Sequence, residues 1–147
     1  MILISHRGNL VGQNKSYENN PDYILKAIQQ GYEVEIDVRR VSGEWFLGHD
    51  KPEYLIKEDF LKNDKLWCHA KNPQALQELL LLGVKCFWHQ EDSYTLTSNG
   101  YIWTYPGEKL VNKSICVIPE KITEQHSALG NCSGICSDFI ENFRSMV

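Results

Sequence analysis

The chain has 147 residues and a net charge of −4, with 42% hydrophobic and 23% charged residues. This balance is typical of a folded globular protein, so we expect a single domain over residues 1–147 rather than a disordered tail. A protein that binds nucleic acid normally carries a basic stripe on its surface, and this sequence has none. We therefore expect no DNA or RNA partner.

The first residues predict a cytoplasmic protein. The apolar run Ile2-Leu3-Ile4 is far too short for a signal-peptide core or a membrane span, and no later stretch is long enough to cross a bilayer. An odd number of cysteines, five, is typical of reduced thiols in the cytoplasm. Cys132 and Cys136 could form a metal pair, but zinc sites normally need two further Cys or His ligands at recognisable spacing.

Two segments of the chain predict a helix by the same signals. Asn20-Pro21 opens the first and Gly31 closes it, and Asn72-Pro73 opens the second and Gly83 closes it. Asn is a good N-cap, Pro suits the first turn, and Gly suits the exit. Each helix lies between two apolar runs, which predict strands at 2–5, 33–38, 66–70 and 86–88. Parallel strands joined by crossover helices are the natural interpretation.

Shorter apolar runs complete the predicted elements. They indicate further strands at 45–47, 101–104, 115–118 and 134–137, a short helix at 58–61 and a closing helix at 140–146. Residues 105–114 and 119–133 are predicted to be mostly irregular. The four tryptophans lie on predicted strands, where core packing is expected.

These elements together predict a reduced (β/α) TIM-like barrel with seven or eight short parallel strands, in which loops replace several helices. A complete barrel of this kind takes about 250 residues, so this one would be unusually small. An open doubly wound sheet is the alternative. An uncovered sheet edge could be buried by a second subunit, which would make the protein a homodimer.

The strongest chemical signal is Glu35-Ile36-Asp37. Residues two apart on a strand point to the same face, so both carboxylates share one face of the predicted strand. Such a pair repels itself unless a cation or a proton relieves it, and its oxygen atoms suit Mg²⁺, Ca²⁺ or Mn²⁺. A solvated strand face at a sheet edge is the alternative.

Further polar residues follow other predicted strands: His6 and Arg7, then His49 and Asp50, then His69 and Lys71. Each group alone could be an ordinary surface turn. The carboxyl ends of parallel strands, however, are where active sites of α/β folds form. Together these residues could transfer protons, hold a metal ion and stabilise phosphate charge.

At this point the sequence resembles the glycerophosphodiester phosphodiesterase family, within the wider group of phospholipase-C-like phosphodiesterases. The family pattern is matched in order and spacing by His6-Arg7-Gly8, Glu18-Asn19, Glu35-Ile36-Asp37 and Gly48-His49-Asp50. The match is specific over the first third of the chain and weaker beyond it, where Lys71 fits the family's Glu-x-Lys strand.

The resemblance implies a phosphoric diester hydrolase acting on a small-molecule phosphodiester similar to a glycerophosphodiester. It implies an acid–base pair (His6 and His49), two phosphate-binding residues (Arg7 and Lys71), metal ligands (Glu35 and Asp37) and a residue that orients the first turn (Glu18). In such enzymes a neighbouring substrate hydroxyl attacks phosphorus while one His takes its proton. The other His protonates the leaving alcohol, and water later opens the cyclic phosphate.

The chain departs from the family where a third metal carboxylate is expected, because His69 stands there. His69 could itself coordinate the metal, which would favour Mn²⁺ or another transition metal. Alternatively, a carboxylate from elsewhere could complete the site, the candidates being Glu91, Asp92, Glu120 and Asp138. The polar segment 89–94 is interpreted as a lid, a metal loop or an ordinary loop.

Three functional readings therefore stand side by side. The first is an active metal-dependent phosphodiesterase. The second is a non-catalytic phosphate-binding module on a degenerate barrel, which the loss of the third carboxylate favours. The third is a lipid phosphodiesterase of the sphingomyelinase-D kind, although those proteins are typically secreted and disulfide-bonded.

Overall fold

The computed structural model describes residues 1–146, apart from the side chains of residues 123–126. One ten-stranded sheet dominates the fold. Its strands are β1 (Ile2–His6), β2 (Glu33–Val41), β3 (Glu44–Leu47), β4 (Tyr54–Ile56), β5 (Leu66–Ala70), β6 (Cys86–Phe87), β7 (Tyr94–Leu96), β8 (Ile102–Thr104), β9 (Ser114–Val117) and β10 (Gly134–Ser137). The α-helices are α1 (Pro21–Gln29), α2 (Glu58–Leu61) and α3 (Pro73–Leu82), and the 3₁₀ helices are η1 (Pro119–Lys121), η2 (Thr123–Asn131) and η3 (Ile140–Met146).

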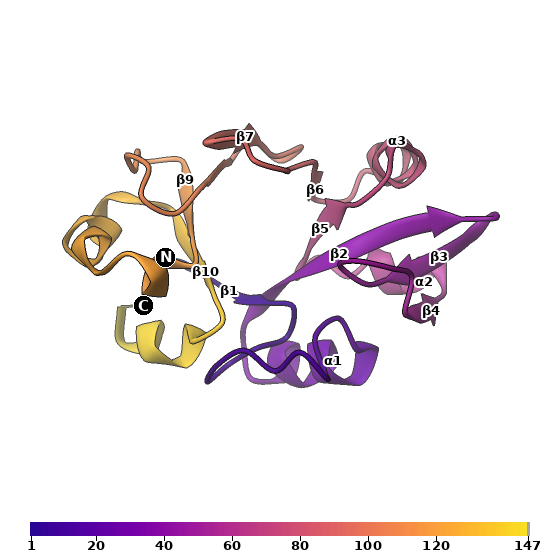
Figure 1. The fold of residues 1–147 in the computed structure, drawn as a ribbon, viewed down its shortest axis with the longest axis horizontal. Coiled ribbons are helices and arrows are strands. Elements are labelled where there is room, and N and C mark those ends of the chain that lie inside the picture. Colours follow the sequence, from indigo (N-terminus) through magenta and orange to yellow (C-terminus); the bar gives the residue numbers. More distant parts are fainter. Residues whose placement is uncertain (147) are drawn as a thin grey trace.

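The sheet is curled, mixed and open. A parallel series runs β6-β5-β2-β1-β10-β9-β8, and the strands follow one another around an arc (Figure 1). Three strands are added in the antiparallel sense, with β3 on β2, β4 on β3 and β7 on β8. No ladder joins β6 to β8 in the part of the chain that the structure describes.

The predicted TIM-like barrel of parallel strands is therefore wrong, and so is the parallel doubly wound alternative. The protein is a half-barrel of mixed strands with few helices. The physical reason lies in the connections, because a parallel crossover needs a connection much longer than two residues. Only Ser42 and Gly43 separate β2 from β3, so the chain can only fold back as a hairpin.

Helix ends were predicted well from the capping residues. The Asn20 side chain accepts hydrogen bonds from the main-chain N–H groups of Asp22 and Tyr23, and α1 starts at the next residue, Pro21. Asn72 caps α3 in the same way, and α3 ends at Gly83 in the left-handed conformation (φ 69°). The strands β4 and β7 were not predicted, and the closing helix is of the 3₁₀ type.

The core is divided by the curled sheet. Val34, Ile36 and Val38 point outward from β2 and pack with α1 and α3 residues such as Ile24 and Leu79. The alternation predicted for this strand is thus confirmed, because Glu35 and Asp37 point to the opposite, inner side.

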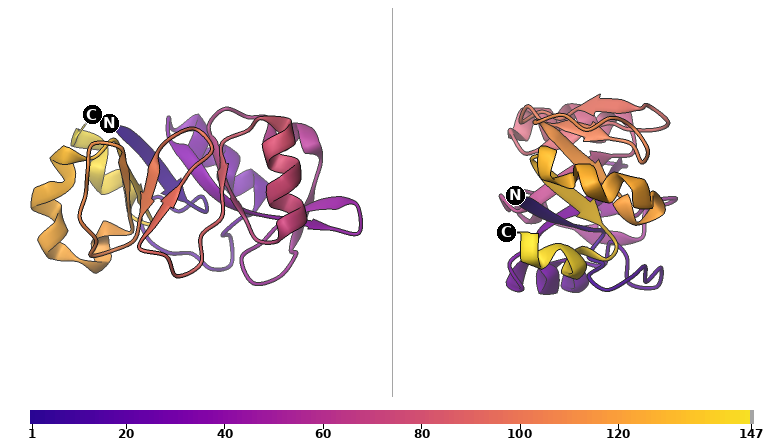
Figure 2. Two further views of the ribbon diagram at one scale, coloured as in Figure 1. Left: turned by 90° about the horizontal axis from the view of Figure 1, so that it is seen from above. Right: turned by 90° about the vertical axis from the view of Figure 1, so that its left-hand side faces the viewer.

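A second cluster fills the inner side of the arc and contains Ile4, Trp67, Phe87, Trp103 and Ile115. Trp45, Trp67 and Trp103 are buried, as expected for core residues, and Trp88 is half-buried. A third cluster packs η2 and η3 against β10. The two ends of the chain lie close together, as both views of Figure 2 show.

The topology places the carboxyl ends of β1 and β5 beside the middle of β2, which continues to Val41 rather than ending at Val38 as predicted. His6 is in register with Glu35, and Asp37 is in register with His69. No helix within residues 1–146 has the length and apolar character needed to cross a bilayer.

Candidate functional site

Glu35, Asp37 and His69 form a buried cluster on β2 and β5. Nδ1 of His69 lies 3.5 Å from Oε1 of Glu35 and 3.3 Å from Oδ1 of Asp37. One ligand atom from each residue fits within 4.8 Å of the others. Glu35 Oε2 and Asp37 Oδ1 are buried and accept no hydrogen bond. The cluster therefore offers two carboxylates and one imidazole, with unsatisfied oxygen atoms that a cation would satisfy.

Basic groups surround Asp37 in addition to His69. Arg7 Nε lies 2.9 Å from Oδ2 and Lys71 Nζ lies 3.8 Å from Oδ1. The Arg7 contact is an ion pair without hydrogen-bond geometry, because Nε makes no hydrogen bond. Burial raises the pKa of Asp37, but His69 and Arg7 outweigh it and hold that pKa well below its usual range. Burial lowers the pKa of His69, but Asp37 and Glu35 together raise it to about 9.

His6 is anchored at the end of β1 by Asp138, which follows β10. His6 Nδ1 lies 2.7 Å from Asp138 Oδ1, while Nε2 lies 3.8 Å from Glu35 Oε2. Asn9 donates to Asp138 Oδ1 at 2.8 Å and to Glu18 Oε1 at 3.0 Å. Burial lowers the pKa of His6, but Asp138 and Glu35 give a net increase. The imidazole is thus fixed through Nδ1, and its Nε2 faces the carboxylates.

The turn after β1 holds Arg7 in place. Arg7 and Asn19 both have left-handed backbone conformations (φ 56° and 62°), and the Asn19 N–H donates to the Arg7 carbonyl at 3.1 Å. Glu18 Oε2 accepts from the Arg7 guanidinium at 3.1 Å, which is the orienting contact predicted for Glu18. Asn19 also accepts from the Asp37 N–H and donates to Asp37 Oδ2, both at 2.9 Å.

His49 enters the site from the loop after β3. The Gly48 N–H donates to the Asp37 carbonyl at 3.0 Å, and Arg39 donates to the carbonyl oxygens of Gly48 and His49. A Cβ at Gly48 (φ 148°) would lie 2.1 Å from the Lys51 carbonyl oxygen, so the loop requires glycine there. His49 Nδ1 pairs with the exposed Asp50 at 2.7 Å.

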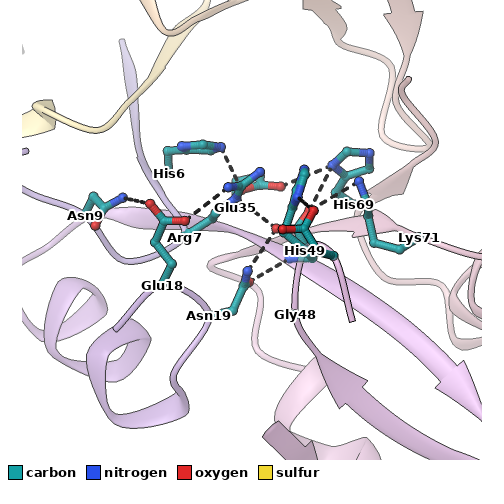
Figure 3. Close-up of polar contacts among 12 residues, drawn as sticks. His6, Arg7, Asn9, Glu18, Asn19, Glu35, Gly48, His49, His69 and Lys71 are labelled. Carbon is teal, nitrogen blue, oxygen red and sulfur yellow. Dashed lines mark hydrogen bonds and ion pairs between the residues drawn. The ribbon is translucent and has the colours of Figure 1, made fainter. Parts of the chain in front are cut away.

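Two adjoining cavities collect these side chains, and Figure 3 shows His6, Arg7, Glu35, His49, His69 and Lys71 around one centre. The larger, here the main cavity, has a volume of about 730 Å³ and is lined by all six. The smaller, here the side cavity, has a volume of about 320 Å³ and is lined by polar residues. Arg7, Gln13 and His49 line both cavities.

The structure thus brings the predicted site residues together. Asp37 lies fully buried behind the main cavity, and Glu18 lines the side cavity. None of the four candidate third carboxylates joins the described cluster. Asp138 binds His6, Glu120 accepts from Ser137 Oγ and the Asp138 N–H, and Glu91 and Asp92 are exposed. Cys132 Sγ donates to main-chain carbonyl groups and belongs to no metal cluster among the described residues.

The segment 89–94 contributes through its main chain. The His89 carbonyl oxygen lies 2.8 Å from His69 Nε2, and His89 Nδ1 lies 3.1 Å from Thr95 Oγ1. The His69 imidazole is therefore fixed through Nε2, and its Nδ1 faces the Glu35 and Asp37 carboxylates. Burial and the neighbouring His69 lower the pKa of His89.

Sequence reasoning missed three contributions to the site. Asn9 and Asn19 tie the first loop to Asp138 and Asp37, and Asp138 pairs with His6 across 132 positions of the chain. Asn19 could have been singled out, because it belongs to the Glu18-Asn19 motif. No sequence signal pointed to Asn9 or to the pairing of Asp138 with His6. These residues meet only because β1 and β10 are neighbouring strands.

Comparison with protein families, curated proteins and solved structures found no match for this chain.

Proposed function

We propose that the protein is a divalent-cation-dependent phosphodiester hydrolase that acts on a small molecule. The observation that carries the proposal is the buried Glu35-Asp37-His69 cluster, which lies at one cavity together with Arg7 and Lys71 and with His6 and His49. The phosphate oxygens need cationic partners, which Arg7 and Lys71 offer. Cleavage of the diester needs proton transfer, for which His6 and His49 are suited.

The donor set fits a divalent cation. Glu35 Oε2 and Asp37 Oδ1 are buried oxygens without hydrogen-bond donors, and His69 Nδ1 points at the same space. Two carboxylates suit Mg²⁺, Ca²⁺ or Mn²⁺, and the imidazole shifts the preference toward Mn²⁺. Bound there, the cation would neutralise phosphate charge and polarise a phosphoryl oxygen.

Arg7 and Lys71 are suited to hold the phosphate. Both line the main cavity, where Arg7 pairs with Glu18 and Asp37 and the Lys71 ammonium lies 3.8 Å from Asp37 Oδ1. Glu18 fixes one nitrogen of the Arg7 guanidinium, so the planar group is oriented before a ligand arrives. A guanidinium matches two phosphate oxygens at once, whereas the Lys71 ammonium acts as a point charge.

His6 and His49 are suited to move protons. Each has Nδ1 paired with a carboxylate, Asp138 or Asp50, at 2.7 Å, which leaves Nε2 for the substrate. One imidazole takes the proton of the attacking hydroxyl as the new P–O bond forms. The other donates a proton to the oxygen that leaves as the old P–O bond breaks. Because the attacking hydroxyl belongs to the substrate, the product of this step is a cyclic phosphate. Water then opens the ring, with the two imidazoles exchanging their roles as acid and base.

The test is hydrolysis of a panel of glycerophosphodiesters, which carry the neighbouring hydroxyl, after chelation and re-addition of Mg²⁺, Ca²⁺ or Mn²⁺. We expect turnover that requires the metal and is lost in His49→Ala and reduced at least 10-fold in Lys71→Ala. Lys62→Ala is the matched control, because Lys62 is an exposed lysine paired with Asp59 on α2. Turnover that persists in EDTA, or an active His49→Ala variant, would contradict the proposal.

A second candidate function is a phosphate-binding module without chemistry. The observation that favours it is that Arg7, His69 and Lys71 already surround Asp37, so the cluster carries its own counter-charges. This candidate predicts that inorganic phosphate raises the melting temperature in EDTA and that no metal produces turnover. Restoring a carboxylate with His69→Glu would then be the first change that gains metal binding.

A further inference from the structure

The lining of the main cavity includes an apolar wall as well as charged residues. The carboxyl ends of β8 and β9 and the segments that follow them supply this wall, which consists of Trp103, Tyr105, Pro106, Val117, Ile118 and Ile122. The proposed chemistry uses none of these side chains. A phosphate and a cation need no apolar contacts, so the wall indicates a further part of the ligand.

The wall is joined directly to the proposed metal cluster by stacked rings. The His69 imidazole stacks on Phe87 with 4.9 Å between ring centroids and 14° between planes. The ring centroids of Phe87 and Trp103 lie 4.4 Å apart, and Trp103 is 3% exposed. An apolar group on this wall would therefore sit next to a phosphate held by Arg7 and Lys71 in the same cavity.

Ile118 is the residue whose backbone is least expected. It adopts the left-handed conformation (φ 47°, ψ 56°), which is strained for a β-branched side chain. Its N–H donates to the Cys136 carbonyl at 2.7 Å and its carbonyl accepts from the Lys121 N–H at 3.1 Å, so β10 and η1 impose the turn. Gly or Asn would adopt this turn with less strain. An isoleucine here places a branched apolar side chain on the cavity wall.

The two cavities differ in size and in the polarity of their lining, and this difference distinguishes the two alcohols of a bound diester. A volume of about 730 Å³ is typical of sites for drug-sized ligands and leaves room beyond a phosphate. The side cavity is lined by polar residues and shares Arg7 and His49 with the main cavity. A phosphate at this junction would direct one alcohol toward polar side chains and the other toward the apolar wall.

We propose that the substrate is an unsymmetrical phosphodiester, with a polar alcohol toward the side cavity and an alkyl alcohol on the wall around Ile118 and Ile122. This inference rests on the proposed function. An alkyl chain fits better than a flat ring, because Trp103 is almost covered and four of the six wall residues, Pro106, Val117, Ile118 and Ile122, are aliphatic. An aliphatic surface suits a flexible chain.

The experiment compares glycerophosphodiesters of methanol, 1-butanol, 1-hexanol and benzyl alcohol, all of which share glycerol as the polar alcohol and have leaving alcohols of similar acidity. We expect kcat/KM to rise at least 10-fold from the methyl to the hexyl ester, because burial of only two of the five added methylenes, at about 0.8 kcal/mol each, already corresponds to a factor of about 15. Binding of methyl and hexyl phosphate, followed by tryptophan fluorescence and thermal shift, repeats the comparison without turnover.

Ile118→Asn is the informative variant, because Asn tolerates the left-handed backbone while removing the apolar surface. We expect it to reduce the hexyl-to-methyl ratio about 10-fold, and Ile122→Asn to act in the same direction. Val111→Asn, at a 43% exposed position that does not line the main cavity, is the control and should leave the ratio unchanged.

The outcomes separate the two proposals. Turnover that is equal for all chain lengths would overturn the alkyl inference and leave the hydrolase standing. A preference for the benzyl over the hexyl ester would replace the alkyl group by a flat ring and so refute it too. No turnover of any ester would refute the hydrolase, and tighter binding of hexyl than methyl phosphate would still support the apolar wall.

Discussion

Asn19 is the residue whose removal tests the site most directly, because its side chain fastens Asp37 to the first loop. Its Oδ1 accepts from the Asp37 N–H and its Nδ2 donates to Asp37 Oδ2, both at 2.9 Å, and the residue is 1% exposed. Asn19→Ala removes both contacts at once. We expect the variant to fold with a clear loss of stability and a less ordered Asp37.

The magnitude follows from the two hydrogen bonds. A hydrogen bond to a charged group contributes about 1.5–3 kcal/mol, and a buried N–H left without a partner costs about 1–3 kcal/mol. Because water will satisfy part of this loss, we expect Asn19→Ala to lower the free energy of unfolding by about 3 kcal/mol. Asn19 also has a left-handed backbone (φ 62°), which costs alanine about 1 kcal/mol more than glycine. Asn19→Gly should therefore be about 1 kcal/mol less destabilised.

The assay is urea unfolding in EDTA, followed by fluorescence of the buried tryptophans Trp45 and Trp67, with linear extrapolation to zero urea. EDTA keeps any cation from compensating for the change at Asp37. Asn99→Ala, at an exposed turn position between β7 and β8, is the matched control. A loss below about 1 kcal/mol in Asn19→Ala would refute the inference that this contact holds Asp37 in place.

Three further predictions concern the loop, the metal and the thiols. Gly48→Ala should lower stability by about 2 kcal/mol or more and lower turnover, because the new Cβ would lie 2.1 Å from the Lys51 carbonyl oxygen; unchanged urea midpoint and rate would contradict this. Mn²⁺ should raise the melting temperature of the wild type in calorimetry, and Asp37→Asn should abolish the increase; an equal increase in both would place the ion elsewhere. The cysteines are buried, and burial raises the pKa of Cys68 and sets that of Cys116 at about 12, so Ellman's reagent at pH 8 should react only after denaturation. Rapid reaction of the folded protein would show that the thiols are accessible.

The capping residues and the strand alternation carried most of what the sequence could predict about the fold. Asn20 and Asn72 mark helix starts because their side chains satisfy main-chain N–H groups locally, and that interaction needs no distant partner. Glu35 and Asp37 share a face because the period of a strand is two residues. Such local rules hold in any tertiary setting.

The barrel prediction failed where connection lengths were overlooked. Ser42 and Gly43 both have positive φ (51° and 78°), which is typical of a two-residue hairpin turn, and they fold β3 back on β2. The turn at Asn99-Gly100 does the same for β7 and β8. Both signals are visible in the sequence, so antiparallel additions to the sheet could have been predicted from it.

The sequence by itself determined which chemical groups stand at the ends of β1 and β5 and on one face of β2, since strand alternation and chain order fix them. Only the tertiary structure decided which of these groups meet. His69 faces Asp37 because β5 pairs with β2, and Asp138 reaches His6 because β10 pairs with β1. These pairings depend on the register of strands far apart in the chain, and register is set by the packing of the whole sheet rather than by any local run of residues.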